Sequence, residues 1–202
     1  MTRKLSLIEP LAVFAAIMAY IWLIRFAHPW FVVPILPAVL FSHFARNERA
    51  RSLGFRITQL RECIRRFGPA LVALVLLMLV GGRLLGTIRP IGLNRAALGL
   101  ALYLPWGLFQ QYLLNGYFLK RFDTALPPRA SDATAAALFS VVHCPNWFLM
   151  LLTPLAGYAS IQIYRRHRNL YFLGVAHAMI GFLLFMVLPD TVIHHLNVGP
   201  AR

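Results

Sequence analysis

The sequence predicts an all-α fold, a polytopic membrane helix bundle with about six to seven transmembrane or half-membrane helices. Of the 202 residues, 59% are hydrophobic and 13% are charged, about half the charged fraction of an ordinary soluble domain. The mean hydropathy is +0.67. The apolar residues gather in long runs separated by short basic stretches, as in chains that cross a bilayer repeatedly. We therefore expect residues 1–202 to form a single integral membrane domain.

The first part of the chain supplies three apolar runs. Residues 8–24 are long for a signal-peptide core and no small-residue cleavage site follows them, so a retained helix is expected. Residues 31–44 contain two prolines, which favours a short span that is kinked or tilted. A third span is expected over residues 69–86, preceded from Ile57 onward by an amphipathic helix on the membrane surface.

The second part of the chain supplies the remaining spans. Residues 96–119 predict a fourth span, closed by a basic pair at its cytoplasmic end, and residues 123–132 predict a polar loop. Residues 133–164 are mostly apolar and would be roughly 48 Å long as one helix. That is more than one span and less than two, so we expect two helices there, one of them short or broken. Residues 170–188 predict the last span.

The charge distribution indicates orientation and partners. The chain has 20 Lys and Arg against 6 Asp and Glu, and seven arginines lie between residues 46 and 66. Such a loop belongs on the cytoplasmic side, so we expect a bacterial inner membrane protein with a cytoplasmic N-terminus. Membrane lipids are the expected partners, and no basic soluble module is present to bind nucleic acid. Two cysteines, Cys63 and Cys144, make no disulfide framework.

Polar side chains recur at one depth in three of the expected spans. Gln110, Gln111, His143 and His177 each lie roughly 10–15 Å from the cytoplasmic end of their helix, counted at 1.5 Å per residue. Asn115 lies on the same helix face as Gln111. Buried amides need hydrogen-bond partners, so these residues either hold helices together or line a functional site, as intramembrane histidines often do.

These residues fall within three short motifs that recur in a fixed order. The motifs are Gln110-Gln111-x-x-x-Asn115-Gly116, Phe139-x-x-x-His143 and His177-x-x-x-Gly181. The chain resembles the CPBP family, also called Abi or CAAX-protease-like, of glutamic-type intramembrane endopeptidases. In that family the motifs read Glu-Glu-x-x-x-Arg-Gly, Phe-x-x-x-His and His-x-x-x-Asn or Asp. The resemblance covers a core of about residues 46–188.

The resemblance implies a peptidase site without metal or cofactor. Its catalytic positions are Gln110, Gln111, His143 and His177. Its substrate-binding positions are Asn115, Phe139 and Gly181. In the family a glutamate of the first motif is thought to activate a water molecule. A glutamine orients water by hydrogen bonds but cannot take its proton near neutral pH.

We therefore expect an intramembrane peptidase scaffold that is catalytically degenerate. One alternative is a weakly active endopeptidase, in which His143 or His177 is the base and the glutamines orient the water. Another is a non-catalytic binding, immunity or sorting protein for membrane-embedded peptides or lipidated protein tails. A zinc site is disfavoured because two histidines lack a third good ligand, and Cys144 is disfavoured as a nucleophile because its side chain and that of His143 point about 100° apart on a helix.

Overall fold

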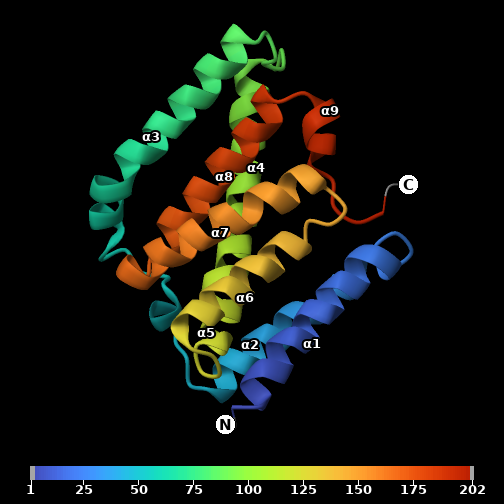
Figure 1. Ribbon diagram of the computed structural model, residues 1–202, viewed down its shortest axis with the longest axis vertical. Coiled ribbons are helices and arrows are strands. Elements are labelled where there is room, and N and C mark those ends of the chain that lie inside the picture. Colours follow the sequence, from blue (N-terminus) through green and yellow to red (C-terminus); the bar gives the residue numbers. More distant parts are fainter. Residues whose placement is uncertain (1–2, 201–202) are drawn as a thin grey trace.

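The computed structural model describes residues 3–200, which form helices joined by turns and no strand (Figure 1). The α-helices are α1 Leu5–Ala19, α2 Ile35–Ala45, α3 Leu60–Leu84, α4 Leu93–Gln111, α5 Lys120–Phe122, α6 Pro128–Val141, α7 Trp147–His167, α8 Leu170–Val187 and α9 Asp190–Ile193. Two π-helical stretches, η1 Tyr20–Ile24 and η4 Tyr112–Leu119, continue α1 and α4. Short 3-10 turns are Pro29–Val32, Ala50–Leu53 and His194–Leu196.

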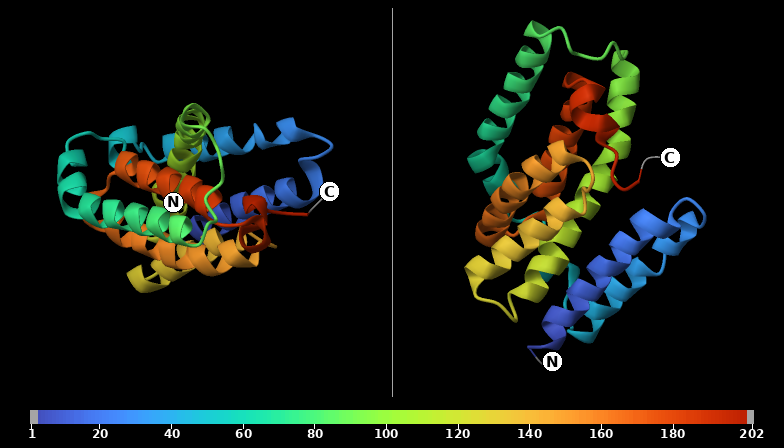
Figure 2. Two further views of the ribbon diagram at one scale, coloured as in Figure 1. Left: turned by 90° about the horizontal axis from the view of Figure 1, so that it is seen from above. Right: turned by 45° about the vertical axis from the view of Figure 1, so that its right-hand side comes forward.

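Four of these helices are long and apolar enough to cross a membrane: α1 with its π-helical continuation, α3, α7 and α8. A further helix, made of α4, η4 and α5 in continuous succession, runs through the middle of the bundle (Figures 1 and 2). These elements confirm the prediction of an all-α polytopic membrane bundle.

Some helix boundaries differ from the expected ones. The surface helix and the third span form one continuous helix, α3, although Pro69 lies inside it. Proline removes one backbone hydrogen bond, and here the helix continues past it. The polar loop is shorter than expected because α6 already begins at Pro128, in the first helical turn, where proline has no hydrogen bond to lose. Residues 142–146 form the expected break between α6 and α7.

Close packing of α4 against α8 positions the middle of the bundle. A Cβ atom on Gly107 would lie 2.7 Å from the carbonyl oxygen of Gly174, and a Cβ atom on Gly174 would lie 2.7 Å from the Cα atom of Leu108. Glycine therefore lets the two backbones approach closely, as small residues do where membrane helices cross. Gln111 follows Gly107 by about one turn and His177 follows Gly174 by about one turn, so the crossing brings these two side chains face to face.

We call one end of the bundle the basic end, defined by the turn 46–59, α5 and the turn between α7 and α8. The side-chain amide of Asn169 donates to the carbonyl oxygen of Arg56 at 2.7 Å, and the Lys120 ammonium lies 3.0 Å from Glu48. These contacts bring together basic stretches that are far apart in the sequence. The opposite end, where α3 joins α4 and α8 joins α9, is called the far end.

A buried ion cluster fastens the hairpin of α1 and α2 to the basic end. The Arg121 side chain is fully buried and donates two hydrogen bonds to Glu48, at 2.8 and 3.2 Å. It also lies 3.4 Å from Glu9 of α1, and Glu9 accepts a hydrogen bond from the Tyr117 hydroxyl at 3.1 Å. Figure 2 shows the α1–α2 hairpin lying along one side of the other helices. The fourth span ends at the basic pair as expected, but Arg121 is an internal cation and not a surface one.

Candidate functional site

Gln111 lies at the point where α4 passes into the π-helical stretch η4, and its amide is the hub of a buried hydrogen-bond network. Its Nε2 atom lies 3.2 Å from Nδ1 of His177 on α8. Its Oε1 atom accepts from Nδ2 of Asn115 at 2.9 Å and from the Ser160 hydroxyl at 2.5 Å. The Asn115 amide also donates to the Ser160 oxygen at 3.0 Å. Residues from α4, η4, α7 and α8 thus meet in one neutral network.

His143 reaches the same region from the end of α6 through the ring of Phe139. Its Nδ1 atom lies 2.6 Å from the Phe139 carbonyl oxygen, and the two ring centroids are 5.2 Å apart. The His177 ring packs edge-on against the same Phe139 ring with a centroid separation of 6.0 Å. The two imidazoles therefore contact one shared aromatic ring.

The hydrogen bonds determine which nitrogen of each neutral ring carries the proton. An amide nitrogen can only donate, so Nδ1 of His177 accepts from Gln111 and the His177 proton is on Nε2. A carbonyl oxygen can only accept, so Nδ1 of His143 carries the proton and its Nε2 presents a lone pair. The outer nitrogens of the two rings are therefore a donor on His177 and an acceptor on His143.

The other sequence-predicted site residues differ in how they join this network. Gln110 is half-buried, and its side chain has no hydrogen bond to the residues that the structure describes. The Oδ1 atom of Asn115 is buried and likewise lacks a partner within residues 3–200. Gly181, one turn beyond His177, is packed so closely that a Cβ atom there would lie 2.9 Å from the Tyr103 ring.

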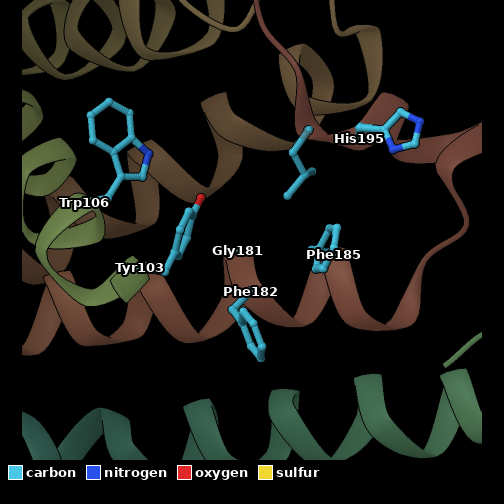
Figure 3. Close-up of a pocket in the computed structure, with 7 residues that line it drawn as sticks. Tyr103, Trp106, Gly181, Phe182, Phe185 and His195 are labelled. Atoms are coloured by element: carbon cyan, nitrogen blue, oxygen red, sulfur yellow. The ribbon is translucent and has the colours of Figure 1, made fainter. Parts of the chain in front are cut away.

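An aromatic pocket of about 380 Å³ opens on the far-end side of this network (Figure 3). It is lined by residues of α4, α8 and the tail: Tyr103, Trp106, Gly181, Phe182, Phe185, His195 and Leu196. Trp106 precedes Gln110 by about one turn, and Gly181 follows His177 by about one turn. The pocket therefore continues along the same two helices that carry the polar network.

The six Asp and Glu side chains are all held elsewhere, each in an ion pair with an arginine. The pairs are Glu9–Arg46, Glu48–Arg121, Glu62–Arg65, Asp123–Arg165, Asp132–Arg165 and Asp190–Arg89. Burial alone would raise the pKa of the Glu48 carboxyl, but hydrogen bonds from Arg121, His43 and Lys120 outweigh it and lower this pKa to about 2. None of the hydrogen bonds of the amide–imidazole network involves a carboxylate.

Sequence reasoning missed Ser160 and the internal position of Arg121. Ser160 is a single small hydroxyl within the apolar α7, which gives no signal by itself because serine is common where membrane helices touch. Arg121 belongs to a basic pair of the kind that ends a span on the cytoplasmic side. A sequence signal was nevertheless available: Glu9 lies inside the first apolar run, and an acid there needs a cationic partner from elsewhere in the chain.

Comparison with known proteins agrees with the motifs. Residues 92–183 match the family model described as Type II CAAX prenyl endopeptidase Rce1-like. This stretch contains all three motifs, whereas α1, α2, α3 and the tail after α8 lie outside it. No curated protein and no solved structure matches the chain.

Proposed function

Residues 92–183 belong to the CAAX-protease-like family, and from this premise we propose that the chain is a catalytically degenerate intramembrane peptidase scaffold. It binds a membrane-embedded peptide or a lipidated protein tail without cleaving it. One observation carries the proposal. The polar network consists of amides, imidazoles and a hydroxyl, while all six Asp and Glu side chains are paired with arginines away from it.

The proposed loss of cleavage follows from the residue types in the first motif. Amide hydrolysis by a glutamic-type site needs a carboxylate that takes a proton from water. Gln110 and Gln111 orient water or a peptide by hydrogen bonds but do not accept that proton. Asn115 stands where the family has arginine, so the network also lacks the cation that would otherwise be buried without a counter-charge. The carboxylates and the guanidinium of the family motif are absent together, so the loss of one leaves no unpaired charge of the other.

Binding remains available to the same residues. Within residues 3–200, the Gln110 side-chain amide has no hydrogen-bond partner, and neither has the buried Oδ1 atom of Asn115. The Gln110 amide and the Asn115 oxygen can pair with the backbone N–H and C=O groups of an extended peptide, which need hydrogen-bond partners inside a membrane. The aromatic pocket next to them accepts an apolar group of the same ligand.

A farnesylated CAAX peptide is the probe that tests the proposal, with purified protein in lipid nanodiscs. We expect saturable peptide binding and no cleavage above the empty-nanodisc background. Gln110→Ala should weaken binding by roughly two- to tenfold, because one hydrogen bond contributes roughly 0.5–1.5 kcal/mol. Arg65→Ala, at an exposed ion pair on α3, is the control and should bind normally. Turnover that His143→Ala abolishes would overturn the proposal.

The companion experiment returns the family residues to their positions. The triple change Gln110→Glu, Gln111→Glu and Asn115→Arg should give measurable cleavage of the same peptide. Cleavage restored by the triple change and absent from the parent chain attributes the loss to these three residues. A triple variant that folds, binds peptide and stays inactive would show that they are not the cause.

A weakly active endopeptidase is the second candidate, favoured by the complementary tautomers of the two histidines. A water molecule between them could donate to Nε2 of His143 and accept from Nε2–H of His177. His143 would then be the base in place of a glutamate. A slow, protein-dependent cleavage that falls on acidification through the titration of His143, and is lost in His143→Gln, would favour this candidate.

We also propose that the basic end faces the cytoplasm of a bacterial inner membrane, which places the N-terminus in the cytoplasm. The seven arginines between residues 46 and 66 support this orientation. Single cysteines introduced at Arg51 and at Leu85 should react with a membrane-impermeant maleimide from opposite sides of intact vesicles. Reaction of both from the same side would overturn the topology.

A further inference from the structure

The tail after α8 folds back onto the turn that carries His143. Nδ2 of Asn146 donates to the carbonyl oxygens of Ile193 and Asn197, at 2.8 and 3.2 Å. The backbone N–H of Gly199 donates to the carbonyl oxygen of Cys144 at 2.8 Å. These bonds join the last described residues of the chain to the short segment between α6 and α7.

The same tail also forms one wall of the aromatic pocket. His195 and Leu196 line that pocket opposite residues of α4 and α8 (Figure 3). The beginning of the tail is held by Asp190, which pairs with Arg89 and lies 3.0 Å from Nδ1 of His195. A single segment therefore contacts both the pocket and the His143 turn.

Asn146 is the side chain where these contacts converge. It is 3% exposed, and its Oδ1 atom caps α7 by accepting from the backbone N–H of Leu149 at 3.1 Å. Its own backbone N–H donates to the carbonyl oxygen of His143 at 2.9 Å. The side-chain oxygen of Asn146 thus caps α7, and its side-chain nitrogen binds the tail. The backbone N–H of the same residue closes the turn that contains His143.

The tail keeps its shape through these contacts and not through its own backbone preference. His194, His195 and Leu196 have φ angles of 48°, 54° and 55°. Three consecutive side-chain-bearing residues in the left-handed region are unfavourable for L-amino acids. Such a conformation persists where surrounding contacts hold it, as the hydrogen bond from Trp147 Nε1 to His194 Nε2 does at 2.8 Å.

We propose that residues 190–200 form a strap that closes the far-end wall of the aromatic pocket and holds the His143 turn in place, with Asn146 as the positioning residue that fastens it. When the strap leaves, the pocket opens and the turn loses its tether in the same step. The coupling between strap and turn stands on the contacts alone. Its use as a gate for a bound peptide rests on the proposed function.

The chain contains a matched control for the central variant. Asn169 caps α8 as Asn146 caps α7, with its Oδ1 atom accepting from the backbone N–H of Phe172 at 2.9 Å and its Nδ2 atom donating to Arg56. Aspartate caps helices as well as asparagine does but has no N–H to donate. Asn146→Asp therefore keeps the cap and releases the strap, while Asn169→Asp makes the same change at the other end of the bundle.

The reactivity of the Cys144 thiol measures release of the strap, and the assay needs no substrate. The carbonyl oxygen of Cys144 holds the strap, and its side chain is half-buried, whereas Cys63 is fully buried. With Cys63→Ala as background and the protein in nanodiscs, Asn146→Asp should raise the rate of Cys144 labelling by a soluble maleimide about tenfold. That is the effect of losing two hydrogen bonds. Asn169→Asp should leave the rate unchanged, and equal rates in the two variants would overturn the proposal.

Two further measurements distinguish release of the strap from a general folding defect of the Asn146→Asp variant. Trp147→Phe removes only the bond to His194 on an exposed side chain and should raise the labelling rate by a smaller factor. The ring ¹⁵N resonances of His143 should shift in Asn146→Asp and stay in place in Asn169→Asp. An unchanged His143 signal together with fast labelling would refute the positioning role. A released strap with unaltered binding of farnesylated peptide would count against the proposed function and leave the strap standing.

Discussion

Nε2 of Gln111 and Nδ1 of His177 lie 3.2 Å apart across the contact between α4 and α8. This bond joins the first and third motifs and orients the His177 ring so that its other nitrogen carries the proton. His143 has the opposite arrangement because its Nδ1–H faces the Phe139 carbonyl. The two histidines, of which His143 is buried and His177 half-buried, therefore carry their protons on different ring nitrogens.

This difference predicts two distinct tautomers. Solid-state ¹⁵N spectra of histidine-labelled protein in lipid at neutral pH should show His177 protonated on Nε2 and His143 protonated on Nδ1. Gln111→Leu should remove the constraint on His177 and leave the His143 signals unchanged. Identical tautomers for the two rings in the parent protein would contradict the hydrogen-bond assignment.

Gln111 and Gln110 should differ sharply in their contribution to stability. Gln111→Ala leaves His177, Asn115 and Ser160 without their shared partner, which should lower the free energy of unfolding by roughly 1–3 kcal/mol. Gln110→Ala removes a half-buried side chain that makes no hydrogen bond to the part of the chain that the structure describes, so its effect should be small. Reversible unfolding in mixed micelles measures both. Equal losses in the two variants would mean that Gln111 is not the hub.

Gly174 should tolerate no side chain. A methyl group there would lie 2.7 Å from the Cα atom of Leu108, so Gly174→Ala must push α4 and α8 apart. Overpacking of this kind costs roughly 1–3 kcal/mol and should also lengthen the Gln111–His177 contact. Gly81→Ala is the control, since Gly81 also lies inside a helix and nothing within 4 Å would meet its new methyl group. The unfolding midpoint of each variant tests the contrast.

Glu48 should make stability depend on pH in the acid range. Its folded-state pKa is about 2, below the ordinary value of 4.5. A depressed pKa means that the stabilisation is complete above about pH 4.5 and is lost as the pH falls from there through about 2. The unfolding temperature of the parent protein should fall more steeply across that window than that of Glu48→Gln.

The same substitution should be destabilising at neutral pH. Glu48→Gln leaves the fully buried Arg121 without its bidentate counter-charge, which should cost about 3 kcal/mol, near the lower end of the range for breaking a buried ion pair. Glu62→Gln is the control, because Glu62 pairs with Arg65 at an exposed site and such pairs contribute little. Equal effects of the two substitutions would argue against a structural role for the Arg121 cluster.

Much of the fold follows from the sequence because apolar run length sets helix length in a membrane. The runs around residues 8–24, 69–86 and 170–188 all became helices within α1 with η1, α3 and α8. Counting residues from the charged ends predicted that Gln111 and His177 lie at one depth, and their side chains do meet in the structure, although the residues between Gln111 and Lys120 are π-helical and not α-helical. Helix boundaries near prolines were less predictable, as Pro69 and Pro128 show, because proline ends some helices and begins or interrupts others.

Contacts between helices that are distant in the sequence could not be predicted from the pattern of apolar and charged residues. Nothing in the local sequence distinguishes Arg121 from an arginine at the membrane surface; only its pairing with Glu48 and its proximity to Glu9 make burial tolerable. Ser160 and the tether from Asn146 to the tail likewise depend on partners 40 or more residues away. The roles that the motifs assign to Gln110, His143 and the other site residues stay predictions.

The π-helical stretch η4 joins the neutral network to the ionic cluster: it contains Asn115 of the network and Tyr117 of the cluster, and it lies between Gln111 and Arg121. A π-helix spreads more residues over each turn than an α-helix does. Deleting a single residue between Asn115 and Tyr117 would rotate one set of side chains against the other. Both sets could not then meet their partner helices at once. The number of residues in η4 is therefore constrained as tightly as their identity, and a one-residue deletion there should be more damaging than most substitutions within it.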